Sequence, residues 1–426
     1  MRILFIVPYF PTRIRTRPFN LIRALAAEGH SLTILTVAGD ATELEEAVAL
    51  RSRAIRVIAV PLGRIRPLVN IAQAMATGEP LQAAYCWHPG LAKTLQTLLG
   101  DETFDVIHVE HLRGARYGLL AKKVVDGIGA TTPIVWDSVD CISHLFRQAS
   151  RQSSARFNRM VTRFELPRTE QYESRLVSGF DRVLTTSPVD RDALSDLAVG
   201  RGRIPSPIHV LPNGVDLVAF QPDPSVTREP ATLILSGKMS YHANVTMAVS
   251  LVRDVMPLVW SVRSDVRLTI VGQDPAPAVL ALGADPRITV TGVVPDIQPH
   301  LARATLAVAP IVYSAGIQNK ILEAMACGTA VITTSAALGG LMASPGIDLL
   351  VEDSDQAFAS AVISLLESDH KREAIARAGR AYVVTNHSWS KVGKDLSALY
   401  QEVQQEGARA FCLPAFDKKM VSLGEV

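Results

Sequence analysis

Short runs of Val, Ile and Leu alternate with segments of helical spacing along most of this chain. The run Ile3–Val7 is followed by a helical segment, Phe19–Glu28, which stops at Gly29, a residue type that commonly ends helices. The runs are apolar throughout rather than at every second position, as is typical of strands buried on both faces of a parallel sheet. In the first half of the chain the expected strands are Ile3–Val7, Leu32–Thr36, Ile55–Pro61, Val106–Val109, Ile134–Asp137 and Val183–Thr186.

The same alternation restarts after residues 209–230, a stretch with four prolines and no helical period that is typical of a linker. Two successive sets of βαβ units predict an α/β fold with two doubly wound parallel-sheet domains, whose ligands bind where the carboxyl ends of the strands face one another. The strands expected in the second domain are Thr232–Leu235, Leu268–Val271, Ile288–Thr291, Leu306–Pro310 and Ala330–Thr334.

The end of the chain predicts one further helix. Between residues 388 and 403 the apolar positions Trp389, Val392, Leu396 and Leu399 share one helix face. We therefore expect an N-terminal domain at 1–205, a C-terminal domain at 206–387, a helix at 388–404 and an irregular tail at 405–426.

Composition narrows the class of protein. The 426 residues are 48% hydrophobic and 20% charged with a net charge of +2, which indicates a globular chain and no nucleic-acid partner. The four cysteines form no CxxC pair, so we expect neither structural disulfides nor a zinc site. The first apolar run has only five residues and no apolar run approaches the roughly 18 to 20 residues of a membrane span, so we expect a cytoplasmic protein without a signal peptide.

The stretch GIQNKILEAMACGTAVITT, which starts at Gly316, holds candidate chemistry. If residues 317–327 form a helix, Lys320 lies in its first turn, where the backbone dipole favours an anion rather than a cation. A glycine-opened helix start with a lysine is a site for phosphate, and Glu323 one turn later could accept hydrogen bonds from a ribose. The alternative is an ordinary surface helix.

Four motifs that appear in order carry a resemblance to a known family. They are PNGVD at 212–216, IVG at 270–272, TGVVPD at 291–296 and ILEAMACGTAVITT at 321–334. Residues 205–400 thereby resemble the C-terminal half of glycosyltransferase family 4, retaining enzymes with two Rossmann-like domains facing a central cleft, the GT-B architecture. Three segments, at 237–245, 291–310 and 316–326, are most similar to sugar transferases associated with exopolysaccharide and exosortase gene clusters. The terminal helix resembles the one that crosses back onto the N-terminal domain in that family.

The resemblance implies roles for particular residues. Glu323 corresponds to the second glutamate of the family's E-x7-E motif, which holds the nucleotide ribose. Lys238 stands where the family usually has an arginine bound to the diphosphate. The other donor contacts implied are Gly316, Ile317, Gln318 and Asn319 around the sugar and diphosphate, and Thr291, Val293 and Val294 beside the base.

This chain departs from the family pattern at two positions. The first glutamate of E-x7-E, which contacts sugar hydroxyls in the family, is replaced by Ala315, and a second basic residue would fall on Ala243. We expect Lys320 to replace the missing phosphate contact, at a cost to the helix of about 0.3 to 1 kcal/mol.

The N-terminal half offers candidates on the opposite side of the cleft. The family often carries an HxH-like signature after the fourth strand, and here Glu110 stands two residues after His108 with His111 next to it. His111 and Glu110 are therefore candidate catalytic residues, with a simple turn role as the alternative for His111. Asp137 and Asp140 follow the next strand at the same edge, where capping hydrogen bonds explain them equally well.

Two arginine-rich segments complete the candidates. Arg13, Arg15 and Arg17 follow the first strand and could bind phosphate on the donor or on a lipid-diphosphate acceptor, or could be purely structural. An arginine-rich helix between Arg147 and Arg175 is either a solvated face or a docking surface for an anionic membrane or a charged acceptor.

The reaction implied by the resemblance is transfer of a sugar, with retained configuration, from a nucleotide diphosphate sugar to a sugar, lipid-linked or small-molecule acceptor. Lysines and the helix dipole can supply the positive charge that a metal would provide at the diphosphate, so we expect no metal and no cofactor. The alternatives are an inactive nucleotide-sugar-binding scaffold and a nucleotide-sugar epimerase of the same fold. A dinucleotide oxidoreductase is disfavoured because no G-x-G-x-x-G follows the first strand of either half.

Overall fold

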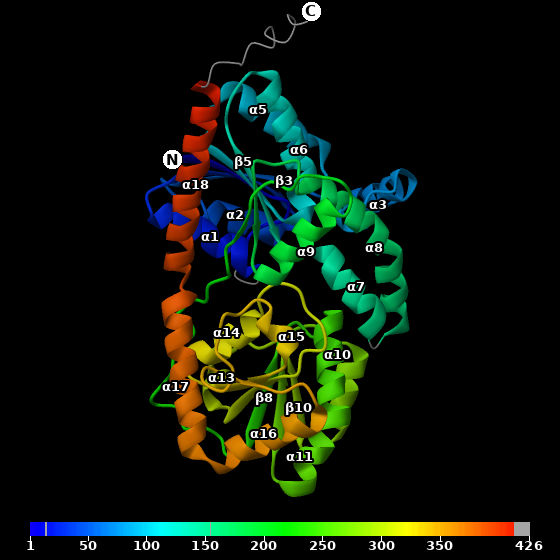
Figure 1. The fold of residues 1–426 in the computed structure, drawn as a ribbon, viewed down its shortest axis with the longest axis vertical. Helices are drawn as coiled ribbons and strands as arrows, with labels where there is room; N and C mark the ends of the chain where they lie inside the picture. Colours follow the sequence, from blue (N-terminus) through cyan, green and yellow to red (C-terminus); the bar gives the residue numbers. More distant parts are fainter. Residues whose placement is uncertain (13–14, 154, 413–426) are drawn as a thin grey trace, which may run out of the picture.

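The computed structural model describes residues 1–12, 15–153 and 155–412, the last five of these as backbone only. Two lobes, each a parallel sheet covered by helices on both faces, lie end to end along the long axis of the molecule (Figure 1). The α/β fold with two doubly wound domains is confirmed.

The N-terminal lobe is built on a seven-stranded sheet of order β3-β2-β1-β4-β5-β6-β7, with every pair parallel. Its interior strand β1 has all five apolar residues from Ile3 to Val7 buried, which explains why its sequence does not alternate. The strands are β1 (Arg2–Val7), β2 (Ser31–Ala38), β3 (Ile55–Pro61), β4 (Val106–Glu110), β5 (Ile134–Val139), β6 (Arg182–Thr185) and β7 (Ile208–Val210).

Helices cover both faces of this sheet. They are α1 (Thr16–Ala27), α2 (Ala41–Ala49), α3 (Arg66–Thr77), α4 (Leu81–Ala84), α5 (Pro89–Asp101), α6 (His111–Gly127), α7 (Ile142–Gln152), α8 (Arg156–Leu176) and α9 (Pro188–Val199). The single arginine-rich helix expected between Arg147 and Arg175 is wrong. The chain breaks there into α7 and α8, which pack against one another.

The C-terminal lobe has a six-stranded parallel sheet of order β10-β9-β8-β11-β12-β13. Its strands are β8 (Thr232–Ser236), β9 (Arg267–Val271), β10 (Ile288–Gly292), β11 (Leu306–Ala309), β12 (Ala330–Thr333) and β13 (Leu350–Val351). Its helices are α10 (His242–Ser250), η1 (Leu251–Val255), α11 (Met256–Val262), α12 (Pro277–Leu280), η2 (Ala281–Ala284), α13 (Gln298–Arg303), α14 (Asn319–Ala326), α15 (Ser335–Leu338), α16 (Asp355–Glu367) and α17 (Asp369–Asn386).

The strand order indicates where a ligand binds relative to each sheet. In each sheet the order reverses beside the first strand, at β1/β4 and at β8/β11. Ligands of such folds bind beyond the carboxyl ends of the strands at this switch point. The loops after β1, β4 and β11 therefore frame the candidate site, and α14 starts beyond the end of β11.

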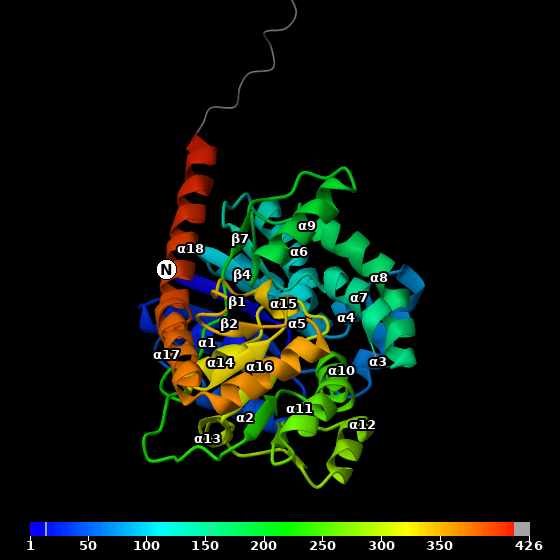
Figure 2. The ribbon, with the colours of Figure 1, turned by 60° about the horizontal axis from the view of Figure 1, so that its bottom comes forward.

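The last helix, α18 (Trp389–Cys412), returns to the N-terminal lobe. Its residues Trp389, Val392, Leu396 and Tyr400 are buried in one cluster with β1 and α1. Figures 1 and 2 show it running along the edge of the molecule from the C-terminal lobe to the N-terminal lobe. The helix continues to Cys412, so the expectation of an irregular tail from residue 405 is wrong as far as Cys412; residues 413–426 lie outside the described part.

Two chain segments cross between the lobes side by side. Val215 N–H donates to His387 O at 2.6 Å, and Val215 pairs with Ser388 in an isolated bridge. Strand β7 pairs with β6, so the N-terminal lobe runs to Val210 rather than ending at residue 205. The linker accordingly begins after β7.

One helical segment, His242–Val262, is long and apolar enough to cross a membrane by length and composition alone, although we expected no such segment. Met247, Leu251 and Val259 on this segment are buried in the core of the C-terminal lobe. The high apolar content is thus what a core helix of this lobe requires.

Candidate active site

Two adjoining cavities lie between the lobes. The smaller, of about 250 Å³, is lined mainly by the C-terminal lobe, and the larger, of about 360 Å³, mainly by the N-terminal lobe. Asp140 and Ile317 line both, so the two cavities meet there. A hollow of about 600 Å³ lies apart from them between α7 and α9, and none of the expected site residues lines it.

The start of α14 faces the smaller cavity. This cavity is lined from the α14 side by Ala315, Ile317, Gln318 and Lys320. Asn244 of α10 and Tyr241, the N-cap of α10, also line it. The helix begins at Asn319 rather than at the expected Ile317, with Gln318 as its N-cap and no side-chain capping bond. Its first turn therefore offers backbone N–H groups and a partial positive charge to the cavity.

Lys320 is a half-buried cation beside this helix start. Its Nζ donates a hydrogen bond to Gln318 Oε1 at 3.0 Å. Burial lowers the pKa of Lys320 to about 8 and raises the pKa of Glu323 to about 7, and the attraction between the two charges opposes both shifts. A bound anion would favour the charged form of Lys320, because an opposite charge within a few ångströms raises the pKa of an amine.

Gly316 needs the conformational freedom of glycine. Its φ is +62°, and a Cβ at this position would overlap the Asp140 carboxylate and come within 2.8 Å of Thr186 Oγ1. Its N–H donates to Asp190 Oδ2 at 2.8 Å, although Asp190 belongs to α9 of the other lobe. The loop before α14 is thus gripped by the N-terminal lobe.

Two further bonds hold this loop, one from the N-terminal lobe and one from the linker. Gln148 Nε2 of α7 donates to Ser314 O at 3.0 Å, and Asn213 Nδ2 donates to Asn319 Oδ1 at 3.0 Å. These contacts describe a cleft closed around the loop Ser314–Asn319.

Asp140 is the carboxylate at the centre of the cleft. Thr186 Oγ1 donates to its Oδ1 at 3.2 Å. Burial raises the pKa of Asp140 to about 7, and the nearby charge of Asp190 raises it further. The expected site residue at this edge of the sheet was Asp137. Strand β5 runs two residues further than expected, so Asp137 lies inside the strand and is fully buried. Asp140, which follows the strand, reaches the cleft instead.

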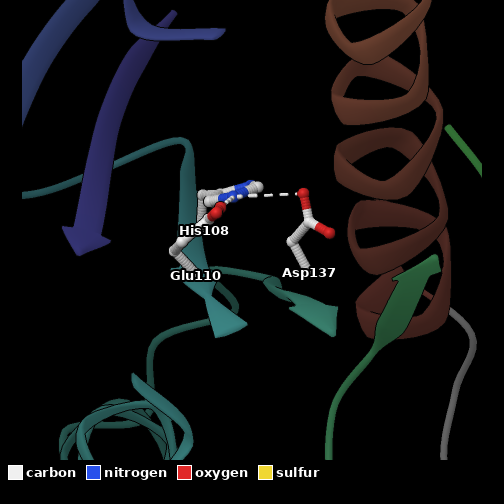
Figure 3. Close-up of side chains that lie close together, drawn as sticks. All are labelled: His108, Glu110 and Asp137. Carbon is white, nitrogen blue, oxygen red and sulfur yellow. Dashed lines mark hydrogen bonds and ion pairs between the residues drawn. The ribbon is translucent and has the colours of Figure 1, made fainter. Parts of the chain in front are cut away.

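Asp137 belongs to a buried ionic network, and Figure 3 shows its side chain beside those of His108 and Glu110. Glu110 connects this network to the larger cavity, which it lines. Arg17 Nη2 lies 2.7 Å from Asp137 Oδ2, and His108 Nε2 lies 3.8 Å from the same oxygen and 3.4 Å from Glu110 Oε2. Arg17 also donates to Leu211 O at 3.1 Å and to Asn213 Oδ1 at 2.8 Å. These contacts favour the structural alternative for Arg17 over a phosphate contact.

One carboxylate oxygen of Glu110 is unpaired among the described residues. Glu110 lines the larger cavity and is 1% exposed, and the unpaired oxygen is its Oε1. Burial raises the pKa of Glu110, while its hydrogen bond with His108 lowers it. A ligand hydroxyl in the cavity could pair with the free oxygen.

His108, Glu110 and Asp137 have the donor set of a metal site, with ligand atoms within 4.8 Å of one another. The guanidinium of Arg17 already neutralises Asp137 at 2.7 Å, and a divalent ion beside it would meet like charge. The geometry thus fits an ion-pair network better than a metal centre.

His111 occupies a strained backbone position at the start of α6, with φ at +62°. It lines the larger cavity, and its Nδ1 accepts a hydrogen bond from Arg113 N–H at 3.3 Å. Burial lowers the pKa of His111 to about 3, and Arg113 lowers it further, so the imidazole is neutral near pH 7.

Several expected residues lie outside the two cavities. Lys238 points its Nζ to within 3.8 Å of Asp274 Oδ2 and is 55% exposed. Val293 is exposed, while Thr291 and Val294 are half-buried, and none of the three lines either cavity. Their donor contacts remain predictions.

The arginines that follow β1 differ in where the structure places them. Arg15 lines the larger cavity and pairs with Glu43 at 2.8 Å. Arg13 lies outside the described residues. Arg113, which the sequence reasoning missed, supplies a further cation to the larger cavity.

Two facing Rossmann-like lobes, closed over a cavity at the carboxyl ends of their strands, define the GT-B class of glycosyltransferase folds. Sucrose-phosphate synthase from Thermosynechococcus elongatus has this fold with a TM-score of 0.70 at 18% identity, covering 95% of this chain and 100% of that chain. The Anabaena protein HepE in complex with UDP-glucose matches with a TM-score of 0.62 at 16% identity, covering 94% and 100%.

Sequence comparison gives the family. Residues 14–214 match the family described as glycosyl transferase 4-like domain, and residues 230–368 match the family described as glycosyl transferases group 1. The chain belongs to the family 4 glycosyltransferases.

Mannosyltransferases are among its curated relatives. A phosphatidyl-myo-inositol mannosyltransferase of Mycobacterium leprae is 24% identical over 96% of this chain and 99% of its own length. A GDP-mannose-dependent monoacylated alpha-(1-6)-phosphatidylinositol monomannoside mannosyltransferase of Corynebacterium glutamicum is 29% identical over 45% of this chain and 55% of its own length.

Proposed function

We propose that this chain transfers a sugar from a nucleotide diphosphate sugar to an acceptor hydroxyl, with retention of the anomeric configuration. The observation that carries the proposal is the start of α14, where open backbone amides and the Lys320 ammonium face a cavity between the two lobes. A helix start with an added cation is suited to a diphosphate.

The donor would lie across the junction of the two cavities. Its diphosphate would meet the α14 amides and Lys320, and its ribose would donate hydrogen bonds to Glu323 one turn further along the helix. The base would reach the loop at Thr291, Val293 and Val294. Lys238 would complete the diphosphate site only if its side chain left Asp274.

The sugar would extend towards the N-terminal lobe. Ala315 offers no polar group to it, and Asp140 from the opposite lobe stands beside Ala315 on the same cavity. We propose that Asp140 accepts hydrogen bonds from sugar hydroxyls and that the free Glu110 oxygen and the neutral His111 ring contact the sugar from the larger cavity.

The chemical step needs no protein nucleophile. The anomeric C–O bond of the donor breaks with both electrons going to the diphosphate oxygen. The acceptor oxygen bonds to the same face of the sugar, and its proton passes to the departing diphosphate. Fixed positive charge at that diphosphate stabilises the transition state, so the proposal includes no metal ion or cofactor.

The substrate classes are proposed from the relatives. Nucleotide sugars of mannose and glucose are the first donors to test, because the printed names of relatives and structural neighbours include GDP-mannose and UDP-glucose. The names of the phosphatidylinositol mannosyltransferases support a proposed lipid-linked acceptor. A saccharide acceptor, a cytoplasmic location and a role in exopolysaccharide or glycoconjugate synthesis are proposed from the sequence motifs alone.

A thermal-shift screen of UDP, GDP, ADP and TDP sugars tests donor binding. A nucleotide sugar at 100 times its Kd should add about 2.7 kcal/mol of stability. Lys320→Ala and Glu323→Ala should each lower kcat/KM by 10-fold or more, about 1.4 kcal/mol, because each removes a donor contact.

Lys391→Ala is the matched control, because Lys391 is exposed on α18, away from both cavities, and pairs with Asp395 at 2.8 Å. Wild-type kcat/KM in both site variants would overturn the site assignment. Binding without turnover would instead support the inactive scaffold, and conversion of the donor sugar without any acceptor would support an epimerase.

A further inference from the structure

Helix α8 has its polar and apolar faces reversed relative to an ordinary surface helix. Thr162, Glu165, Thr169 and Glu173 are buried against the lobe, while the opposite face is apolar and exposed. The exposed apolar residues are Phe157 (68%), Met160 (62%), Val161 (37%) and Phe164 (44%), at the i, i+3, i+4, i+7 spacing of one helix face. Leaving such a face in water forgoes the hydrophobic stabilisation that burial would provide.

Helix α3 carries a second exposed apolar stripe. Leu68, Val69 and Met75 are exposed on it, and Ile65 precedes it with 75% of its surface exposed. Figures 1 and 2 both show α3 and α8 on the same side of the N-terminal lobe, away from α18. The backbone N–H of Leu81, just after α3, donates to Glu165 of α8 at 2.8 Å, which ties the two regions together.

The chain segments that carry the two stripes are rich in arginine. Residues 141–164 contain five arginines and no Asp or Glu, and residues 47–78 likewise contain five arginines and no Asp or Glu. Arg156, Arg159 and Arg163 repeat along α8 beside the apolar stripe. The net charge of the whole chain is only +2, so these two segments are more basic than the chain as a whole.

We infer that the α3/α8 face docks on an anionic lipid membrane. An apolar helix stripe flanked by arginines is the pattern of a helix that lies in the interface plane, with its apolar side chains below the headgroups and its cations among the phosphates. Each arginine near an anionic surface contributes about 1 kcal/mol, a factor of about five in binding.

The docking face is close to the candidate active site. Arg147 of α7 pairs with Glu170 of α8 at 2.7 Å, and Leu145 and Ala149 of α7 pack on Tyr313, which lines the smaller cavity. An acceptor held in the membrane would thus meet the enzyme one helix layer from the cleft. The inference itself does not require the transferase activity, because membrane binding is measured without a donor.

Flotation of the full chain with lipid vesicles tests the inference. We expect binding to vesicles of phosphatidylcholine mixed with phosphatidylglycerol, and much weaker binding to vesicles of phosphatidylcholine alone. Binding should fall steeply with salt, since the screening length shrinks from about 8 Å at 0.15 M to about 3 Å at 1 M.

Two variants separate the apolar and charged contributions. Phe157→Ser with Met160→Ser and Phe164→Ser should reduce binding at least 10-fold. Arg156→Gln with Arg163→Gln should reduce binding to the anionic vesicles about 25-fold, five for each charge. The matched control replaces three exposed apolar residues outside the N-terminal lobe, Val218 of the linker and Val262 and Met342 of the C-terminal lobe, with Ser and should bind as wild type.

Folding of each variant is checked by its Tm and by its thermal shift with a nucleotide sugar, which should stay unchanged. Absence of wild-type binding to anionic vesicles at low salt would overturn the inference, as would equal losses in the control and the α8 variants. A wild-type dimer that the triple Ser variant converts to a monomer, with no vesicle binding, would make this face a contact between two copies and would also overturn it.

Discussion

At the scale of single residues, the carboxylate of Asp140 has an unfavourable position in the donor-free cleft. Burial of this carboxylate and the nearby charge of Asp190 together raise its pKa to about 7 from an ordinary value of 3.8. Between these two pH values the folded chain binds more protons at this site than the unfolded chain. Its contribution to stability is therefore present at low pH and is lost as the pH rises towards 7.

Asp140→Asn should therefore stabilise the protein at pH 8 and have little effect at pH 4. The amide keeps the shape of the side chain and removes the charge beside Asp190. We expect the Tm at pH 8 to rise by about 2 to 4 °C, which corresponds to about 1 kcal/mol for a domain of this size. Thermal unfolding of the two proteins at both pH values measures the difference.

The control is Asp192→Asn, which removes a 63% exposed carboxylate of the same helix as Asp190. It should show no such dependence on pH. A Tm of Asp140→Asn that equals the wild-type value at pH 8 would show that the buried charge carries no penalty.

At the scale of elements, the packing of α18 on the N-terminal lobe includes a buried polar contact. The hydroxyl of Tyr400 lies 2.7 Å from His108 Nδ1, and both side chains are fully buried. Through His108 the helix contacts Glu110 and Asp137, so the last element of the chain supports the network that Glu110 connects to the larger cavity.

Tyr400→Phe should lower the free energy of unfolding by about 1 to 3 kcal/mol, because it leaves a buried ring nitrogen without its partner. Urea unfolding followed by circular dichroism measures the change. Tyr85→Phe, at a 42% exposed tyrosine, is the control and should have little effect. Equal stability of Tyr400→Phe and wild type would mean that this contact adds nothing to the docking of α18.

The elements themselves were largely predictable because their signals are local. The continuous apolar runs identified the long strands, and Ile55–Pro61 matched β3 at both ends. The short strands β7 and β13 were missed, since two or three residues carry no periodic signal. The position of Lys320 beside the smaller cavity was predictable because it depends on one short helix start, whereas Glu323, one turn later, lines neither cavity and its ribose contact stays a prediction.

The far side of the site was harder to predict because it depends on how the two lobes face each other. The segment WDSVD does not reveal where β5 ends. Asp137 was therefore predicted as the site residue at this edge, whereas Asp140, which lines the cleft, could not be distinguished from a residue that only caps a turn. Arg113 gave no sequence signal at all, since only the turn of α6 directs it to the larger cavity.

At the scale of the whole molecule, closure of the lobes depends on Gly316. Its N–H bonds Asp190 of the other lobe, and the space beside it is filled by Asp140. Any side chain at this position would separate the loop before α14 from the N-terminal lobe.

Gly316→Ala should open the molecule and reduce nucleotide-sugar affinity 10-fold or more, as measured by small-angle scattering and by thermal shift. Gly346→Ala is a matched control, since Gly346 also has a positive φ, +79°, but has nothing within 4 Å of an added Cβ. The control should lose some stability from backbone strain of about 1 to 2 kcal/mol and keep wild-type affinity. Wild-type dimensions and affinity in Gly316→Ala would show that closure does not depend on this contact.

The return of α18 to the first lobe affects the order in which the chain can fold during synthesis. Domains generally fold as they leave the ribosome, the N-terminal one first. Here Trp389, Val392, Leu396 and Tyr400, which complete the first lobe, are translated after the whole second lobe. A nascent chain that has reached only residue 387 therefore exposes an apolar seam along β1 and α1, and the first domain to be made is the last to be finished.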